Sequence, residues 1–293
     1  MKKILKKDLT ALEALKELFP DCSRATFSKW LKINRIEIDG QKVARLDTPL
    51  KKGATLEVLC KPSKNRSSLP VLYRDEHIII LDKPAGLLSV KSDHGPKNSL
   101  HDKIKKETKS KVFVVHRLDK ETSGVILYAL SERAYQHLKK QFFEKSAKRT
   151  YAALIEGNLD QPKGTWISYL FDEGIVVKPA KNKHLGKKAV AKFERLAKGE
   201  LYNAPYALLK VQLETGRKNQ IRVQAEEAGT PIAGDKKYGA QSNPIRRLGL
   251  HAAMLEFTHP ITKKMMKVHS KVPQVFFKPF KEKAQKLSDA FEK

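Results

Sequence analysis

The sequence has little cysteine and no long apolar run. Its two cysteines, Cys22 and Cys60, are far apart, and neither has a Cys-x-x-Cys neighbour. This spacing excludes a cysteine-based zinc site and a disulfide framework, and it is typical of a protein of the reducing cytosol. No stretch approaches the roughly 20 apolar residues that a membrane-spanning helix needs. We therefore expect a cytoplasmic protein without a membrane partner.

The common catalytic signatures are also missing. The sequence contains no phosphate-binding glycine-rich loop, no His-Glu-x-x-His motif and no Gly-x-Ser-x-Gly motif. Its nine histidines do not have the spacing of metal ligands. These absences argue against the enzyme classes that the motifs define, and the sequence predicts no metal site.

Acidic residues are scarce relative to basic ones. The 293 residues include 59 Lys and Arg against 32 Asp and Glu, which gives a formal net charge of +27. Such an imbalance opposes compaction by self-repulsion and attracts a polyanion. Nucleic acid is the partner that this charge favours, and an anionic membrane surface is the weaker alternative.

Residues 1–60 contain signals for two short helices and a small sheet. Thr10 and Glu13 have the spacing of a capping box, and apolar residues recur after them at helical spacing. Ser23 can cap a second helix, and Asp39-Gly40 between two short strand-like segments predicts a tight hairpin turn. Basic residues accompany both the helix and the hairpin, and they are Arg24, Lys29, Lys32, Arg35 and Lys42.

This segment resembles the alpha-L RNA-binding domain, the type found in a small-subunit ribosomal protein. The resemblance rests on Ser23-Arg24-Ala25-Thr26, Asn34-Arg35-Ile36, Asp39-Gly40 and Lys52-Gly53. Because basic residues fall on both helix and hairpin, RNA binding is favoured over a generic helical hairpin with a charged surface. Residues 61–70 then have the polar, basic composition of a linker.

Residues 71–280 alternate between strand-like and helix-like segments. One helix is expected at 131–144, and strands are expected at 77–81, 112–115, 125–130, 150–155, 206–213 and 251–257. Because the order is not a clean strand-helix repeat, we expect an α+β fold whose mixed, largely antiparallel sheet has flanking helices. Residues 281–293 read as a charged C-terminal tail that can fray.

The segment His-Arg-Leu-Asp-Lys-Glu-Thr-Ser-Gly at 116–124 lies between two strongly apolar strands. A carboxylate at a turn between buried strands is held rigidly, as a nucleophile must be, and this makes Asp119 a candidate. The alternative is a surface loop in which Asp119 caps a turn and pairs with Lys120 or Arg117. The residues of this segment leave both readings open.

The same segment resembles, without departures, the H-R-L-D-x-x-T-S-G motif of the large-subunit ribosomal RNA pseudouridine synthase family (RluA-type). Further segments resemble the other motifs of that family in the same order, at 71–87, 148–151, 213–239 and 247–252. The resemblance implies that Asp119 is the catalytic carboxylate and Arg222 its partner. It further implies that Tyr151 packs on the target base and that Arg117 helps to displace the uridine from its stack.

The chemistry of pseudouridine formation fits those residue types. The reaction cuts the bond from sugar to nitrogen, turns the uracil and rejoins it through carbon-5, so no cofactor is required. Asp119 must be ionised to act, and a neighbouring guanidinium such as that of Arg222 favours the charged form. Tyr151 offers a flat apolar face and a hydroxyl near carbon-5, where a proton must leave. Its alternative role is that of an ordinary core aromatic.

RNA contacts must offset the few kcal/mol that unstacking the target base costs. Lys187 and Lys188 in the basic run 181–188, together with the run 103–111, are candidates for phosphate contacts. Each run can equally be a solvated loop. The family commonly has His where this chain has Asn219 and Gln224. Because neither amide can carry a proton charge, these departures bear on the support of Arg222 or on substrate preference.

Ribosomal RNA is the expected partner, and no obligate protein partner is evident. A synthase acting on transfer RNA is one alternative, and a non-catalytic RNA-binding or ribosome-assembly protein on the same fold is another. A DNA-binding protein is a third, but no helix-turn-helix or zinc-finger spacing supports it. The target uridine, the oligomeric state and the atom that Asp119 attacks are left open.

Overall fold

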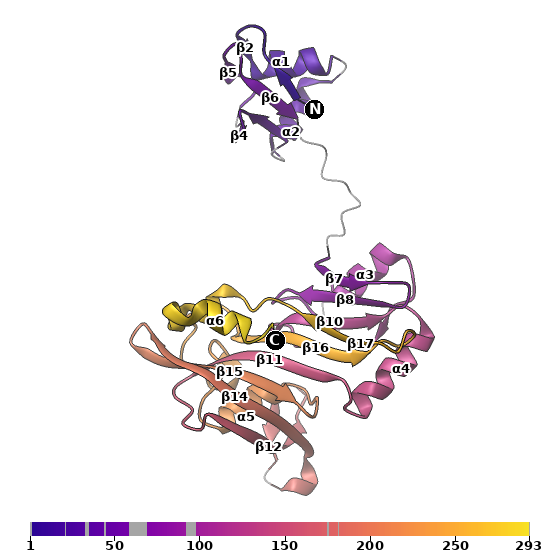
Figure 1. Cartoon of the computed structure of the whole chain (residues 1–293), viewed down its shortest axis with the longest axis vertical. Helices are drawn as coiled ribbons and strands as arrows, with labels where there is room; N and C mark the ends of the chain where they lie inside the picture. The colour runs from indigo at the N-terminus through magenta and orange to yellow at the C-terminus, as the bar shows by residue number, and fades with distance from the viewer. Residues whose placement is uncertain are drawn as a thin grey trace. The chain divides into compact units, whose positions relative to one another are not determined.

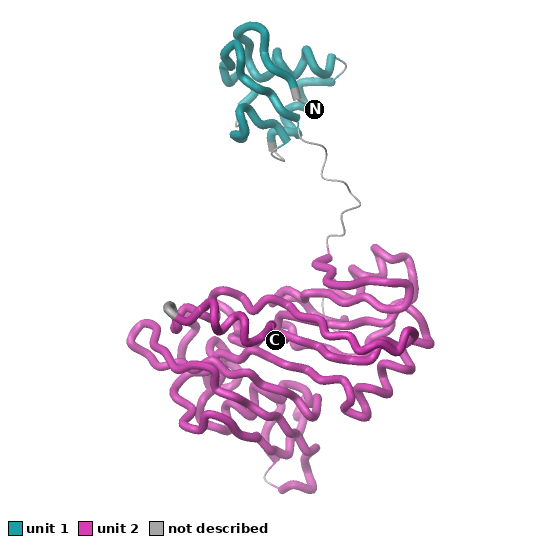
Figure 2. The backbone as a smooth tube through the Cα atoms, viewed as in Figure 1, with its two compact units in different colours: residues 1–68 teal, residues 69–293 magenta. Residues whose placement is uncertain are grey.

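The computed structural model describes residues 2–20, 22–32, 35–43, 45–58, 69–91, 98–174, 176–180 and 182–292. The chain divides into two compact units, Met1–Ser68 and Leu69–Lys293, which Figure 2 colours separately. Most of the expected linker, 61–68, lies outside the described residues. Within the described part of the chain, no helix is both long and apolar enough to cross a bilayer.

The N-terminal unit contains two short helices and a four-stranded sheet. The helices are α1 (Ala11–Leu18) and α2 (Arg24–Lys32). The sheet has the order β1-β6-β3-β4, with strands β1 (Lys2–Ile4), β6 (Thr55–Val58), β3 (Ile36–Ile38) and β4 (Gln41–Lys42). A separate pair joins β2 (Leu9–Thr10) to β5 (Pro49–Leu50).

The local signals in this unit form the structures expected from them. The Thr10 hydroxyl accepts a hydrogen bond from the Glu13 N–H, while the Glu13 carboxylate accepts one from the Thr10 N–H. Asp39 and Gly40 have φ angles of 48° and 79°, the left-handed pair of a type I′ turn, and join β3 to β4. One apolar core holds the unit together, and it includes Leu15, Phe27, Trp30, Ile36 and Leu56.

The C-terminal unit is built on one sheet of eleven strands. In Figure 1 its labelled strands follow one another from β7, at the top of the unit, down to β12. Its main path is β13 (Val177–Pro179), β12 (Lys163–Asp172), β14 (Lys187–Leu201), β15 (Ala204–Leu213), β11 (Lys148–Glu156), β16 (Leu250–Thr258), β10 (Ser123–Ala129), β8 (Ile78–Lys83) and β7 (Val71–Arg74). Strand β17 (Met265–His269) pairs with β16, and β9 (Phe113–Val114) pairs with β10. Strands β10 and β16 run parallel, and the other pairs described are antiparallel. The predicted α+β fold with a mixed, largely antiparallel sheet is confirmed.

The helices of this unit are short. They are α3 (Leu100–Thr108), α4 (Glu132–Phe143), α5 (Gln220–Glu227) and α6 (Ala284–Asp289), with 3-10 turns η1 (Lys183–Leu185), η2 (Lys236–Tyr238) and η3 (Gln274–Lys283). The expected helix at 131–144 corresponds to α4, and each expected strand overlaps a strand of the sheet. Strands β12, β13, β14 and β17 were not expected.

The two faces of the sheet pack against different layers. Along β11, Tyr151 lies in the same apolar cluster as Ile221 of α5, whereas Ala152 lies in a cluster with Phe276 of η3. Because side chains alternate along a strand, one face of β11 serves the α5 side and the other the C-terminal segment. The functional motifs gather on the α5 side.

The C-terminal segment is not a fraying tail, and that expectation is wrong for the residues described. Leu287 and Phe291 are only 5% and 3% exposed, and they pack with the phenylalanines of η3. Lys210 of β15 also donates a hydrogen bond to the Ala290 carbonyl. Charged residues dominate the composition here, but a few apolar side chains suffice to fix the segment on the sheet.

Candidate active site

Asp119 lies in the loop that joins β9 to β10, and β10 is an interior strand of the sheet between β16 and β8. Gly124, at the start of β10, has a φ of 112°, and a Cβ there would collide with the backbone of Ala252 in β16. Only glycine combines this conformation with such a close approach. Gly124 thus lets β10 and β16 run side by side in parallel, which carries the loop over the α5 side of the sheet.

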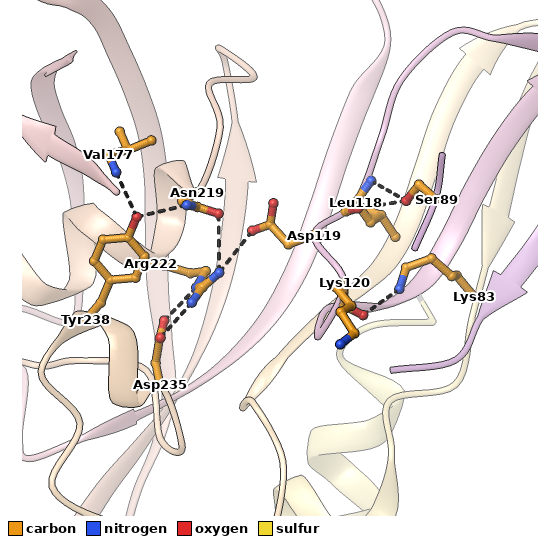
Figure 3. A network of polar contacts seen from close by, with 10 residues as sticks. All are labelled: Lys83, Ser89, Leu118, Asp119, Lys120, Val177, Asn219, Arg222, Asp235 and Tyr238. Atoms are coloured by element: carbon orange, nitrogen blue, oxygen red, sulfur yellow. Dashed lines mark hydrogen bonds and ion pairs between the residues drawn. The ribbon is translucent and has the colours of Figure 1, made fainter. Parts of the chain in front are cut away.

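Hydrogen bonds fix the backbone on both sides of Asp119 (Figure 3). Before it, the Ser89 hydroxyl donates to the Leu118 carbonyl at 2.7 Å and accepts from the Leu118 N–H at 3.0 Å. After it, Lys83 Nζ donates to the Lys120 carbonyl at 3.0 Å. Because the backbone is fixed on both sides of Asp119, the position of its carboxylate is restricted, and the loop is preorganised.

Lys83 is a buried cation with a structural task. It is 0% exposed, and Nζ also donates to the carbonyls of Pro84 and Leu87. Burial lowers its pKa to about 8, while the charges of Glu121 and Asp119 act in the opposite direction. At neutral pH the ammonium therefore stays mainly protonated, with three carbonyl acceptors for its three donors.

Arg222 reaches the same place from α5. Its Nε and Nη2 donate to the two oxygens of Asp235 at 2.6 and 2.7 Å, a bidentate pair. Its guanidinium also lies over the ring of Tyr238, 4.8 Å from the centroid. Burial opposes the charge of Arg222, but the hydrogen bonds and charge of Asp235 outweigh it and raise the pKa of the guanidinium. Asp235 thus fixes both the charge and the direction of Arg222.

The remaining guanidinium nitrogen of Arg222, Nη1, faces Asp119. Arg222 Nη1 lies 3.6 Å from Asp119 Oδ2, with the two side chains 11% and 24% exposed. This is an ion pair rather than a hydrogen bond, because the separation exceeds hydrogen-bonding distance. The two residues line one small hollow with Arg117 and Tyr151. The structure therefore brings together all four residues that the sequence nominated for the reaction.

Tyr151 lies on β11 and is 7% exposed. Burial raises the pKa of its phenol, and the nearby Asp119 charge acts in the same direction, against Arg149. The phenol is neutral at physiological pH, so it presents an uncharged ring and hydroxyl to the hollow. Tyr151 also belongs to the apolar core. One part of the side chain therefore packs as a core aromatic, while another part lines the hollow.

Asn219, one of the two departures, supports Arg222 directly. Its Oδ1 accepts a hydrogen bond from Arg222 Nη1 at 3.2 Å, and its Nδ2 donates to the Tyr238 hydroxyl at 2.8 Å. Gln224 faces away and donates to backbone carbonyls of β12 and β14, so it holds α5 on the sheet. Neither contact needs an ionisable group.

The remaining sequence candidates lie apart from this hollow. Lys187 and Lys188 are exposed at the start of β14, whereas Lys181 and the side chain of Lys32 lie outside the described residues. In the N-terminal unit Arg24, Lys29 and Lys42 are exposed. Arg35 is instead only 8% exposed, and its guanidinium lies 4.4 Å from the centroid of the Trp30 ring.

Sequence reasoning missed the residues that position the site. Lys83, Ser89 and Asp235 were given no role, although Lys83 and Asp235 lie inside the motif segments. A lysine and an aspartate within otherwise apolar or glycine-containing motifs are the signal that was available, because fully buried charges need partners.

The fold and this hollow define a candidate enzyme site that contains an aspartate and an arginine on a mixed sheet. Residues 77–227 match the family described as RNA pseudouridylate synthase. The chain belongs to that family, and it is an RluA-type RNA pseudouridine synthase, an isomerase that acts on RNA.

Two relatives and one solved structure illustrate the similarity. The RNA pseudouridine synthase YhcT of Bacillus subtilis is 32% identical, with 90% of this chain and 87% of that protein covered. Ribosomal large subunit pseudouridine synthase D of Xanthomonas campestris is 31% identical, with 89% of this chain and 84% of that protein covered. The structure of human RNA pseudouridylate synthase domain containing 1 has a TM-score of 0.61 at 21% identity, covering 80% of this chain and 98% of that one, and it shares the fold.

Proposed function

We propose that Asp119 is the catalytic carboxylate of a synthase that converts uridines of large-subunit ribosomal RNA to pseudouridine in the cytoplasm. The observation that carries this proposal is the pairing of Asp119 with Arg222, whose own direction is set by Asp235. The guanidinium lies 3.6 Å from Asp119 Oδ2, so it offsets the negative charge of the carboxylate without tying up its oxygens in a hydrogen bond. The carboxylate can therefore attack the substrate or stabilise a cation on the sugar.

Tyr151 and Arg117 serve the base in this proposal. The Tyr151 ring lines the hollow beside Asp119, so an unstacked uracil can lie on its face, with the neutral hydroxyl near carbon-5. Arg117 lies two residues before Asp119 on the same loop. An extended guanidinium there can fill the space that the extruded uridine leaves in its stack.

The N-terminal unit, in particular residues 1–60, supplies non-specific RNA affinity as an alpha-L type domain, while residues 71–280 supply the chemistry. The side chains of its exposed Arg24, Lys29 and Lys42 form no hydrogen bond or ion pair with the described residues. Such side chains are available for phosphate contacts, which dominate affinity for RNA. Lys187 and Lys188 extend the basic surface on the larger unit.

The X. campestris relative is named for the large ribosomal subunit, and this name supports ribosomal RNA as the substrate. Mapping pseudouridines in total RNA from cells with and without the gene tests the proposal directly. We expect loss of one or a few pseudouridines in large-subunit ribosomal RNA. If pseudouridines were lost from transfer RNA alone, the substrate would be transfer RNA and not ribosomal RNA. An unchanged pseudouridine map would favour the non-catalytic alternative.

A further inference from the structure

A second and larger cavity adjoins the hollow at Asp119. Its volume is about 540 Å³, and it shares Arg117 and Tyr151 with the hollow. The shared residues place the two spaces next to each other along the Tyr151 side of the sheet. A chain segment that enters the hollow therefore has the larger cavity directly beside it.

Arg149 of β11 lines this cavity without a partner of opposite charge. Its Nε is buried and forms no hydrogen bond in the described part of the chain. Its recorded contact is with the Phe142 ring, whose centroid lies 5.7 Å from the guanidinium carbon. Burial lowers the pKa of Arg149, with no carboxylate among the causes. A half-buried arginine left in this way destabilises the fold unless a ligand pairs with it.

The surrounding chain keeps the space around Arg149 clear. A Cβ on Gly216 would collide with Arg149 Nη1 and would lie 3.3 Å from its guanidinium carbon. Gly216 has no left-handed φ that would by itself call for glycine. The glycine therefore leaves room for the guanidinium in the position that it has here.

Cations predominate around the cavity. Exposed Lys145 and Arg217 line it together with Arg117, and the carboxylate of Glu214 is paired with Lys192 at 2.7 Å. His116 adds no charge, because burial lowers its pKa to about 3 and its Nε2 accepts a hydrogen bond from the Leu127 N–H. The cavity thus presents net positive charge to whatever enters it.

An exposed aromatic ring stands at the edge of this basic space. Phe143, the last residue of α4, is 87% exposed, whereas its neighbour Phe142 stacks on His116 with the ring centroids 4.7 Å apart. Basic side chains with an exposed aromatic ring are the combination that holds single-stranded nucleic acid, phosphate on the cations and base on the ring.

We propose that this cavity is a second nucleotide subsite, which binds the nucleotide next to the target uridine with its phosphate on Arg149 and its base on Phe143. The subsite rests on the proposed function, because it presupposes that an unstacked uridine occupies the hollow at Asp119. A phosphate of the bound RNA would supply the anionic partner that the Arg149 guanidinium lacks among the described residues. Two unstacked neighbours also require a flexible RNA segment, so the enzyme selects loops or bulges over continuous helix.

The first experiment separates a ligand-binding arginine from a structural one. Arg149→Met keeps the apolar stem and removes the unpaired charge. The variant is tested in the Asp119→Asn background, which leaves the RNA unmodified. We expect it to bind the ribosomal RNA fragment that wild-type protein modifies about tenfold more weakly. The salt slope, which is the dependence of the logarithm of the binding constant on the logarithm of the salt concentration, should be lower by about 0.7 in magnitude. The melting temperature should stay the same or rise. A lower melting temperature with unchanged affinity would overturn the assignment.

The matched control for this variant is Arg133→Met, which removes an exposed charge from α4 outside the cavity. It reports the effect of net charge alone, and we expect less than a twofold change in affinity. Equal losses for the two variants would mean that Arg149 acts only through the overall charge, and would overturn the subsite.

The second experiment addresses the base. Phe143→Ala should weaken binding about tenfold with no change in salt slope, since stacking involves no counterion. An abasic substitution at the neighbour of the target uridine, tried on each side, should weaken wild-type binding similarly on one side only. On that side the two losses should not add in a double-mutant cycle. Tyr202→Ala, a 77% exposed aromatic residue elsewhere, is the control. Additive losses on both sides would overturn the stacking role.

The two failures can be told apart by the product. If wild-type protein forms pseudouridine in the fragment while the Arg149 and Phe143 variants bind it normally, the subsite is wrong and the proposed function stands. If wild-type protein forms no pseudouridine in any RNA, the proposed function fails and the subsite fails with it.

Discussion

Exposed ion pairs occur in both units of the protein, but the larger unit also buries charged side chains that have partners. In the N-terminal unit the recorded ion pairs, such as Arg45 with Asp47 and Lys51 with Asp8, are exposed to solvent. In the C-terminal unit Lys83 and Asp235 are buried, and Arg222 is almost so. Exposed pairs contribute little to stability, whereas buried charges cost free energy unless each has its partner.

This difference separates binding from chemistry. Exposed cations can exchange counterions for phosphates without disturbing the fold, and this is how proteins hold RNA in general. Buried charges act where water is excluded and where their direction is fixed, and this is how a site stabilises charge during a reaction. In the proposed function, the N-terminal unit serves the first task and the loop at Asp119 serves the second. The four predictions below test that division.

The largest effect is expected at Asp119. Asp119→Asn removes the negative charge but keeps the size, so Arg222 loses its anion and the reaction its carboxylate. We expect pseudouridine formation to fall by about 10⁴-fold or more while RNA affinity changes little. The measurement is product per enzyme at saturating RNA. Asp160→Asn, at an exposed aspartate, is the control, and substantial activity of the Asp119 variant would remove Asp119 from the mechanism.

Acid should destabilise one unit and not the other. Burial lowers the pKa of His116 to about 3 and that of His251 to about 4, and residues 1–68 contain no histidine. Between pH 7 and pH 5 the unfolded C-terminal unit binds protons at these histidines that the folded unit does not. Its free energy of unfolding should therefore fall by about 2 kcal/mol per histidine.

The chain carries a separate reporter for each unit, since its two tryptophans are Trp30 and Trp166. In the full-length protein, Trp166→Phe leaves Trp30 to follow the N-terminal unit, and Trp30→Phe leaves Trp166 to follow the other. Urea titrations at pH 7, 6 and 5 should shift the midpoint of the Trp166 transition alone. Equal shifts of both transitions would show that the buried histidines do not control acid stability.

The same contrast explains what the sequence could predict. The Asp119 loop stood out because its motif is contiguous and lies between two apolar strands, but its catalytic reading came from the resemblance to the family. The turn at Asp39 was found because it depends on two adjacent residues. The pairing of Lys83 with the Lys120 carbonyl leaves no trace in the sequence, because any residue offers a carbonyl. The exposed charges of the N-terminal unit were easier to assign than Arg35, whose burial depends on Trp30.

The sequence did not predict strand β14 or the packing of the C-terminal segment, because both depend on contacts between distant residues. Strand β14 is 15 residues long, but it buries small residues such as Ala189 and Ala191 between charged ones, so its alternation is weak as a hydrophobic signal. The C-terminal segment was read as a tail because charged residues dominate its composition, although Leu287 and Phe291 are buried. Strand β14 is recognised by its pairing with β12 and β15, and the C-terminal segment by its packing on the sheet.

Removing residues 1–68 should have a smaller effect than either change in the larger unit. The truncated protein keeps Asp119 and its supports, so its rate at saturating RNA should be unchanged. Its affinity should fall by about 10- to 100-fold, and its salt slope by about two, for the loss of about three phosphate contacts. Binding curves at several salt concentrations measure both quantities. An unaltered slope would assign the phosphate contacts to the larger unit.

The smallest effect should come from a single exposed lysine. Lys42→Gln in β4 removes one charge that has no acidic partner among the described residues, so affinity should fall about two- to threefold, equally for all RNA sequences, because a phosphate contact carries no sequence information. Lys51→Gln is the matched control, since the charge of Lys51 is already offset by Asp8. If the Lys51 variant lost as much affinity as the Lys42 variant, net charge rather than unpaired surface cations would account for the binding of this unit. A loss confined to one RNA sequence would instead mean that the N-terminal unit reads bases, and the division between the two units would have to be redrawn.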